Sequence, residues 1–439
     1  MTNPESMRDE NVVGDSTADR DARLTPIFPM ETIHGASVIV GGVGALGNEV
    51  LKNLVLIGVG RILVCDLDNI ERHNLTRSVM FRDDDVGRPK AEAAVARARE
   101  LNPNVQVTAF VRSIGELGLG AFRRVDVAYS TFDGYMPRFL MNASCLSVGT
   151  PWVDGGMDLV NHEAGEVFVL DARDPDARCF TCGLDPERVA MLMNRVRDFA
   201  GCGPMAVKAA DGGGVPTTSM MASVIGGIQV MAGLAIVADR RLGSATQGYE
   251  WVARSAATWR SEVLRLDLRA RSVLRVRNRR MRGCYHHDCA IPPRVPMNEI
   301  VEVAAWDSRT TTPRHLLERA ISDLGTDHVS IQLPEVLVPS MECLGCGARW
   351  PWFRSIATLR MLRDVGECKA CGGDAVTATR GEALLTGLEL DSPYLDRPLG
   401  EIGIRPLDIL PACVLGPDRE TVDQRWYELT GDAAPLGLA

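Results

Sequence analysis

The stretch VIVGGVGALG at residues 38–47 decides the fold. Its apolar run has the composition of a buried strand. The glycines Gly42, Gly44 and Gly47 then form G-x-G-x-x-G at the start of a helical pattern, and the next apolar run, RILVCD, ends at Asp66. In a βαβ unit this spacing places a helix N-terminus beneath a phosphate and an acid beside a ribose hydroxyl. The stretch therefore predicts a strand, a tight turn, a helix and a nucleotide site.

Alternating strand and helix patterns extend outward from this stretch, from residue 36 to about residue 156. Apolar runs predict strands in HGASVIVGG, GRILVCDLD, VQVTAF, DVAYST and PWVDGG, and helical periodicity predicts helices in ALGNEVLKNLVLIG and RPKAEAAVARARELN. Further on, GEVFVL and the run from residue 251 to residue 277 have the pattern of antiparallel strands. The predicted fold class is α/β, a Rossmann-like doubly wound sheet with an antiparallel extension.

Length and composition indicate more than one domain. The chain has 439 residues, 46% hydrophobic and 24% charged, which is ordinary for globular proteins. We expect a disordered tail at residues 1–30, a nucleotide-binding domain at residues 31–290, a Pro-rich linker at residues 291–312 and a smaller domain at residues 313–439. The net charge of −9 argues against nucleic-acid binding. The polar N-terminus has no apolar signal core, which indicates a cytoplasmic protein.

The apolar stretch from Met220 to Ala238 is long enough to cross a membrane. It is rich in Gly and Ala, contains Ser223 and Gln229, and has no flanking aromatic belt. Thr218 precedes it and provides a helix start. We predict a buried core helix and no membrane partner.

The residues after Asp66 indicate phosphoryl chemistry rather than hydride transfer. Asp66 and Asp68 are followed by Asn74 and Arg77, and Lys90 opens a predicted helix. A dehydrogenase needs no cations here. An enzyme that attacks the α-phosphate of ATP does, because negative charge builds on the phosphoryl oxygens in the transition state. The guanidinium of Arg77 and the ammonium of Lys90 suit this requirement.

These motifs together resemble the superfamily of ubiquitin-activating enzymes and the bacterial ThiF/MoeB/HesA class of adenylyltransferases. The resemblance rests on GGVGALGNEVLKNLVLIGVGRILVCDLDNIERHNLTRSVMF, DVGRPKAE and ELNPNVQV, and extends from residue 35 to residue 289. It implies that the domain at residues 31–290 is an adenylation domain. The ATP-binding residues that it implies are Gly42, Gly44, Gly47, Asp66, Asp68, Asn74, Arg77, Lys90 and Asp133. It also implies catalytic roles for Arg77, Lys90 and Asp133, with Mg²⁺ bound by Asp133.

Other positions around Asp133 follow the family less closely. Arg138 and Asn142 stand at the spacing of the family, but Ser78 and Gly134 replace the glutamine and asparagine that the family often has. The N-terminal arginine that reaches the phosphates of a neighbouring subunit corresponds best to Arg23.

The resemblance implies adenylation of the C-terminal carboxylate of a ubiquitin-like or sulfur-carrier protein by a homodimer, with release of pyrophosphate. Two alternatives stay open. One is an adenylyltransferase that acts on a peptide or a small carboxylate in natural-product biosynthesis. The other is a non-catalytic binding scaffold, in view of the two positions that depart from the family.

Paired cysteines in a chain without an export signal favour zinc over disulfides. Cys179 and Cys182 match the first zinc pair of the family, and Cys284 begins the second pair. Its partner is Cys289, in a loose C-x₄-C, or His287, in a C-x₂-H.

A second cluster needs no family argument. Cys343 and Cys346 in ECLGCG, and Cys368 and Cys371 in ECKACGG, form two knuckles with a glycine after each. This spacing is typical of a zinc ribbon, in which four thiolates close a structural site. The sequence thus predicts two structural Zn²⁺ ions, and the domain at residues 313–439 is expected to be a zinc-ribbon domain.

Cys202 is the single cysteine with a candidate catalytic role. It stands in a glycine-rich segment near Lys208. We consider two interpretations, a nucleophile that accepts the carrier as a thioester and an inert packing thiol.

Overall fold

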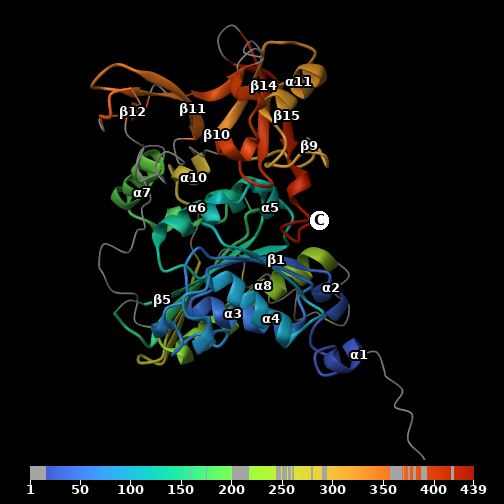
Figure 1. Cartoon of the computed structure of the whole chain (residues 1–439). Coiled ribbons are helices and arrows are strands. Elements are labelled where there is room, and N and C mark those ends of the chain that lie inside the picture. Colours follow the sequence, from blue (N-terminus) through green and yellow to red (C-terminus); the bar gives the residue numbers. More distant parts are fainter. Residues whose placement is uncertain are drawn as a thin grey trace, which may run out of the picture.

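The computed structural model of the chain contains two β-sheet units, one above the other in Figure 1. The structure describes residues 16–158, 160–174, 176–199, 217–243, 249, 255, 259, 262–277, 280–288, 294–355, 368, 370–373, 376–378, 382–386, 393–416 and 420–439. The first unit contains the predicted nucleotide loop, and the second contains the two predicted knuckles.

The strands of the first unit are β1 (Ser37–Gly41), β2 (Arg61–Cys65), β3 (Gln106–Phe110), β4 (Val127–Ser130), β5 (Trp152–Met157), β6 (Ala164–Leu170), β7 (Glu262–Asp267) and β8 (Ser272–Arg277). Its α-helices are α1 (Ser16–Asp21), α2 (Met30–His34), α3 (Ala45–Ile57), α4 (Lys90–Leu101), α5 (Leu119–Arg123), α6 (Tyr135–Val148), α7 (Pro186–Phe199), α8 (Ser219–Leu242) and α10 (Tyr285–Asp288).

The first sheet has the strand order β3-β2-β1-β4-β5-β6-β7-β8. The strands from β3 to β5 pair in parallel, whereas β6, β7 and β8 pair antiparallel. The predicted Rossmann-like sheet with an antiparallel extension is therefore confirmed. The strand order reverses between β1 and β4, and open α/β sheets bind ligands at such a point, beyond the carboxyl ends of the strands.

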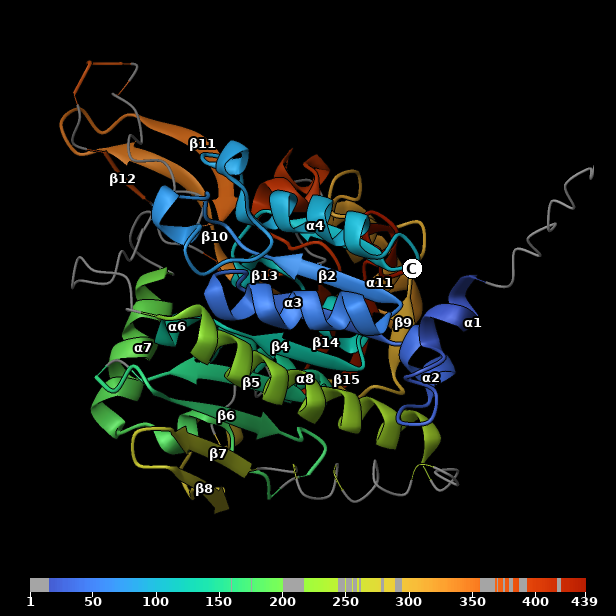
Figure 2. The same ribbon diagram turned by 90° about the horizontal axis from the view of Figure 1, so that it is seen from below.

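Helices cover both faces of this sheet. Figure 2 shows α3, α4 and α8 side by side on one face. Successive side chains of a strand point to opposite faces, so Val38 and Val40 of β1 join the cluster beneath these helices. Ile39, between them, joins a second cluster that includes Phe122 of α5 and Met141 of α6.

α8 is the helix predicted from the apolar stretch. Thr218 precedes it, and its hydroxyl accepts a hydrogen bond from the Met221 N–H at 3.2 Å. A Cβ on Gly226 would lie 3.0 Å from Glu49 Cβ, so the glycine allows α8 to pack closely on α3. Among the described helices, α8 alone is long and apolar enough to span a membrane, yet 67% of its most apolar window is buried. This burial supports a core helix.

The second unit is a sheet with its own core. Its elements are β9 (Ile300–Glu302), α11 (Pro313–Leu324), β10 (Val329–Cys343), β11 (Arg349–Ser355), β12 (Val376–Ala378), β13 (Glu382–Thr386), β14 (Ile409–Leu415) and β15 (Thr421–Glu428). The strand order is β11-β10-β14-β15-β9, and β12 and β13 also pair with β10. α11 begins at Pro313, as predicted, and buries Leu316 and Leu317 against Ile331 and Leu410.

The last residues of the chain cover part of the first sheet. Leu436 and Leu438 are buried in the same apolar cluster as Ile39 and Leu63. A Cβ on Gly437 would lie 2.6 Å from the hydroxyl oxygen of Thr108 on β3, which shows how closely this segment approaches the sheet. The two units therefore share this apolar cluster, in addition to the core that the second unit has of its own.

A charged cluster lies at the same junction. The carboxylate of Glu428 on β15 is fully buried, and its two oxygens lie 2.6 Å from Arg123 and 2.8 Å from Arg124. Glu302 on β9 pairs with the same arginines from the solvent side. Removing one partner of such a buried pair leaves an uncompensated charge, so the cluster fixes how the units dock.

Two of the expected boundaries differ from the structure. α1 lies within the expected disordered tail, and Asp21 Oδ2 at its end is 3.2 Å from His34 Nε2 of α2. β9 lies within the expected linker and pairs in parallel with β15. Both segments are too short for a periodic signal, and their order depends on contacts with distant residues.

Candidate nucleotide site and metal centres

The glycine loop lies at the carboxyl end of β1. Gly42 has φ +83°, a left-handed conformation that favours glycine. A Cβ on Gly47 would lie 2.0 Å from the Gly42 carbonyl oxygen, so only glycine lets α3 approach the loop. Thr131, which follows β4, donates a hydrogen bond from its hydroxyl to the same oxygen at 2.8 Å. Backbone geometry thus explains the first and last glycines of the motif.

The N-terminus of α3 is open to a ligand. Gly44 is the N-cap residue, it provides no side-chain cap, and a Cβ on it would meet no described atom within 4 Å. The first N–H groups of a helix have no partners within the helix and carry partial positive charge. This end of α3 can therefore bind a phosphate, as the sequence predicts.

The two acids after β2 lie at the same edge of the sheet. Asp66 accepts hydrogen bonds from the N–H groups of Val43 and Asp68, both at 2.8 Å. Burial raises the pKa of Asp66, and the nearby charge of Lys90 and these two amide hydrogen bonds oppose the rise. Lys90 Nζ lies 2.9 Å from Asp68 Oδ2. Asp66 is thus held directly beneath the glycine loop, and Lys90 is held beside it by Asp68.

Asn48 connects the segment containing Arg77 to α3, and sequence reasoning missed this residue. Its Oδ1 accepts the Met80 N–H at 2.7 Å, and its amide donates to the Val43 carbonyl at 2.6 Å. Arg77 is three residues before Met80, so this contact anchors its segment to α3. The available signal was a polar residue at a position that the helix buries completely.

The side chains of Arg77 and Asn74 make local contacts, so their predicted contacts with the phosphates are supported less directly than the sequence suggests. Arg77 is half-buried, and its Nη1 donates to the His73 carbonyl at 2.8 Å. Asn74 is buried, and its Oδ1 accepts the Glu71 N–H at 2.8 Å within a short 3₁₀ turn. That oxygen stabilises the turn, so a role of Asn74 at the phosphates stays a prediction.

Asp133 is exposed on the loop that follows β4, on the other side of the glycine loop. The neighbouring Phe132 packs on β1, since a Cβ on Gly41 would lie 2.6 Å from its ring. The Thr131 N–H donates to the Gly41 carbonyl at 2.9 Å. An exposed carboxylate beside a phosphate site has the oxygen ligands that Mg²⁺ prefers.

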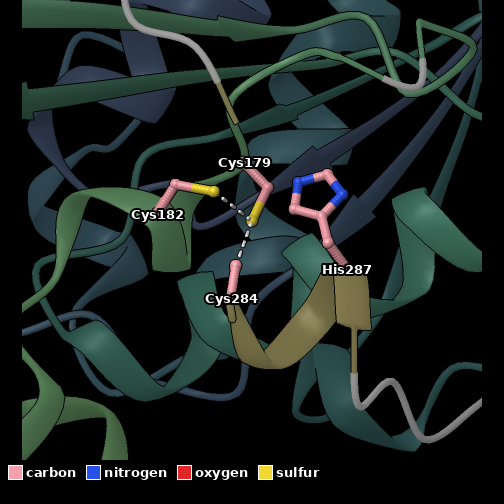
Figure 3. Close-up of side chains that lie close together, drawn as sticks. All are labelled: Cys179, Cys182, Cys284 and His287. Carbon is pink, nitrogen blue, oxygen red and sulfur yellow. Dashed lines mark hydrogen bonds between the residues drawn. The ribbon is translucent and has the colours of Figure 1, made fainter. Parts of the chain in front are cut away.

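The first cysteine cluster unites two distant segments (Figure 3). Ligand atoms of Cys179, Cys182, Cys284 and His287 all lie within 4.8 Å of one another. Hydrogen bonds from the Cys179 and Cys182 thiols hold the pKa of Cys284 well below its usual range. Three sulfurs and one imidazole fit a tetrahedral structural zinc site.

His287 is the fourth residue of this cluster among the described residues. Its Nε2 is buried and has no hydrogen-bond partner in the described part of the chain. Burial lowers the pKa of His287, which favours the neutral ring that binds metals. Cys289 lies outside the described residues.

Asn142 connects the first cluster to α6. Its Oδ1 accepts the Phe180 N–H at 3.0 Å, and its Nδ2 lies 2.7 Å from His286 Nδ1. Burial lowers the pKa of His286 to about 4, so this ring stays neutral. The Thr181 hydroxyl lies 3.1 Å from the same nitrogen. The sequence placed Asn142 at the family spacing but gave no sign of this contact.

The second cluster has the predicted two-knuckle form. Ligand atoms of Cys343, Cys346, Cys368 and Cys371 lie within 4.8 Å of one another. Gly347 and Gly372, each after the second cysteine of a knuckle, have φ +71° and +72°. Their N–H groups donate to the carbonyls of the first cysteines at 2.8 and 2.7 Å. The donor set fits a closed Cys₄ zinc site at one end of β10.

Cys202 lies outside the described residues.

The geometry fits a nucleotide-binding α/β unit that also contains a cysteine-rich cluster suited to a metal ion. The model of the ThiF family matches residues 18–273, more than half of the chain. The chain therefore belongs to the ThiF family, as the resemblance predicts.

Curated relatives extend this result. The chain is 41% identical over 128 residues to the sulfur carrier protein adenylyltransferase of Thermus thermophilus, covering 29% of this chain and 47% of that one. It is 35% identical over 185 residues to the SAMP-activating enzyme E1 of Haloferax volcanii, covering 42% of this chain and 65% of that one. The chain thus spans less than two thirds of either relative. A solved structure of Escherichia coli MccB with MccA-N7isoASN matches 61% of this chain and 74% of that one, with 17% identity and a TM-score of 0.44.

Proposed function

We propose that this chain is a cytoplasmic, ATP-dependent adenylyltransferase that activates the C-terminal carboxylate of a ubiquitin-like or sulfur-carrier protein. The observation that carries the proposal is the open N-terminus of α3 behind the glycine loop, with Asp66 beneath it. The two relatives, a sulfur carrier protein adenylyltransferase and a SAMP-activating enzyme, support the substrate class.

Each predicted residue has a task in this reaction. The phosphates of ATP bind at the N-terminus of α3, and Asp66 accepts a hydrogen bond from the ribose. Mg²⁺, when bound by Asp133, neutralises charge on the phosphates. A carboxylate oxygen of the carrier attacks the α-phosphorus, the bond to the bridging oxygen of the β-phosphate breaks, and pyrophosphate leaves. Arg77 and Lys90 stabilise the negative charge that develops on the phosphoryl oxygens.

A homodimer is part of the proposal. Met220, Val224 and Met231 repeat at helical spacing along α8 and are 69%, 39% and 44% exposed. An apolar row of this kind on an otherwise buried helix suits contact with a second copy. A strictly monomeric mass at micromolar concentration, together with full activity, would contradict a dimer.

Transfer of the carrier to Cys202 is the last step that we propose. A thiolate attacks the acyl-adenylate carbonyl, AMP leaves, and a thioester forms. Cys202→Ala should then leave pyrophosphate exchange nearly intact and abolish a carrier–enzyme adduct that thiols cleave. An adduct that persists in this variant would exclude Cys202.

The test of the proposed function is magnesium-dependent ATP–pyrophosphate exchange in the presence of a small carrier protein with a free C-terminal glycine. Arg77→Ala should lower the exchange rate by about 10²-fold or more, since removal of one preorganised charge contact has this effect in other enzymes. Asp133→Ala should weaken the dependence on Mg²⁺. Arg72→Ala is the matched control, because that side chain is 80% exposed in the same segment. Unchanged exchange in both Arg77→Ala and Asp133→Ala would contradict the assignment.

A further inference from the structure

A buried polar network joins Ser130, at the carboxyl end of β4, to its neighbour Asp154 on β5, behind the loop that carries Asp133. Its centre is Asp154 on β5, whose side chain is only 6% exposed. The Ser130 hydroxyl donates a hydrogen bond to Asp154 Oδ1. The Trp152 indole N–H donates in turn to the Ser130 oxygen at 2.8 Å. Ser130 and Asp154 are therefore fixed relative to each other by the core of the sheet.

Arg138 connects this network to the Asp133 loop. It lies in the first turn of α6, is 16% exposed, and its Nε is 3.4 Å from Asp154 Oδ1. Its Nη2 donates to the Phe132 carbonyl at 2.6 Å and to the Gly155 carbonyl at 3.2 Å. A guanidinium in this position needs a counter-charge, which Asp154 provides, and its planar fork then directs Nη2 at the peptide bond that precedes Asp133.

The loop is held from the opposite side by the glycine loop, through the hydroxyl of Thr131 and the ring of Phe132. The backbone of the loop that carries Asp133 is thus held by two groups of contacts. One group belongs to the predicted nucleotide site, and the other is the pair of Arg138 and Asp154.

From this geometry we propose that Asp154 is a positioning residue for adenylation, which with Arg138 orients the Asp133 loop towards magnesium and ATP. The role rests on the proposed function. Asp154 does not touch the reacting atoms, and acts by keeping the Arg138 guanidinium on the Phe132 carbonyl.

The protonation of Asp154 gives the proposed positioning role a characteristic pH dependence. Burial raises its pKa to about 6, against the lowering effects of Arg138 and of the Ser130 hydrogen bond, and Glu166 on β6 raises it further. Arg138 and Glu166 are the charged groups that face it from the neighbouring elements, and Glu166 is itself paired with Arg265 at 3.0 Å. Above pH 6 the carboxylate is ionised and pairs with Arg138. Below pH 6 it is protonated, the pair is weakened, and the affinity for magnesium-bound nucleotide falls.

The experiment compares the full-length protein with Asp154→Asn, using calorimetry for Mg·ATP binding and the exchange assay for KM and kcat. We expect the dissociation constant and the KM for Mg·ATP to rise about tenfold at pH 7.5, since one charged contact of this kind corresponds to about 1.4 kcal/mol. We also expect the decline in affinity below about pH 6 to disappear in Asp154→Asn. Glu166→Gln is the matched control for KM at pH 7.5, because it removes a nearby carboxylate that does not contact the Asp133 loop. Since Glu166 raises the pKa of Asp154, the decline in affinity should move to lower pH in this variant and not disappear.

Ser130→Ala keeps the test informative if Asp154→Asn does not fold. Loss of the hydroxyl removes a hydrogen bond that lowers the pKa of Asp154, so the decline in affinity should move to higher pH. An unchanged affinity and pH profile in the Asp154→Asn protein, or a Ser130→Ala profile that does not move, would overturn the positioning role. A variant that loses only thermal stability and active fraction, with KM unchanged, would do the same. Nucleotide binding is measured without a carrier, so this result is separate from failure of the proposed function, which would appear as no exchange in the wild type.

Discussion

The two cysteine clusters share a ligand chemistry but differ in how they belong to the fold. The first is buried and joins cysteines that are 105 residues apart in the sequence. The second joins cysteines that are 28 residues apart, and two of its four thiols are exposed. The first contacts α6 through Asn142, whereas the second closes two turns at the end of β10. The comparison teaches that the first cluster is built into the unit with the nucleotide loop, whereas the second belongs to a local module at the end of β10.

The largest expected difference between the clusters is in exchange activity after one cysteine ligand is removed from each. Cys284→Ser should release one zinc, lower the melting temperature of the first unit by many degrees and abolish pyrophosphate exchange. Structural zinc contributes roughly 10–16 kcal/mol in zinc-finger peptides, which is comparable to the whole stability of an ordinary domain. Cys368→Ser should also release one zinc but keep most of the exchange activity. Elemental analysis, calorimetry and the exchange assay test this pair, and equal loss of activity in both variants would break the comparison.

The second-largest effect is expected at the fourth ligand of the first cluster. His287→Ala should weaken zinc binding at the first cluster by about 10- to 100-fold or more, because an imidazole ligand is lost. Cys289→Ala should leave the zinc affinity unchanged. Competition with a chelating dye measures both affinities. The reverse order would assign the ligand to Cys289 and show a Cys₄ site.

Asn142→Ala tests the contact between the first cluster and α6. Both zinc ions should remain, since Asn142 is not a ligand, but exchange should fall by about tenfold, the lower end of the effects seen for residues that orient metal ligands. Asn142 lies one helical turn from Arg138, so the change should appear in the KM for Mg·ATP. Full activity with normal zinc content would mean that the cluster and the nucleotide site are independent.

The smallest effect is expected at the tip of the second cluster. Leu344, between Cys343 and Cys346, is 69% exposed. Leu344→Ser should change neither the zinc content nor the exchange rate, since a surface substitution is usually within about 0.5 kcal/mol in stability. Reduced exchange with a given carrier, with zinc retained, would instead assign this tip a part in carrier binding.

Local patterns predicted most of the fold. The strand–loop–helix at residues 38–57, the crossover helix from Lys90 and the two knuckles all have signals within about 20 residues. The predicted antiparallel extension also formed, as β6, β7 and β8. The seven-stranded second sheet was not predicted from the sequence, which indicated only a zinc-ribbon domain there, because several of its pairing strands are far apart in the sequence.

The site was predictable where the backbone dictates the residue. A left-handed turn requires glycine at Gly42, and a close backbone contact requires it at Gly47. Because no other residue meets these requirements, they are visible in the sequence as a motif. Asn48 and Asp154 left none, because each acts through a contact with a distant segment. A buried polar side chain in an apolar run is a weak signal for such a contact, and it applied to Asn48 and Asp154.

The most direct measurement is the intact mass of a candidate carrier protein after incubation with the purified chain, ATP and Mg²⁺ and rapid quenching in acid. We predict a carrier whose mass has increased by one AMP, that reverts when pyrophosphate is added, and that is absent with Arg77→Ala. Tight binding of Mg·ATP without an adenylated carrier and without pyrophosphate exchange would contradict adenylation and leave a nucleotide-binding scaffold.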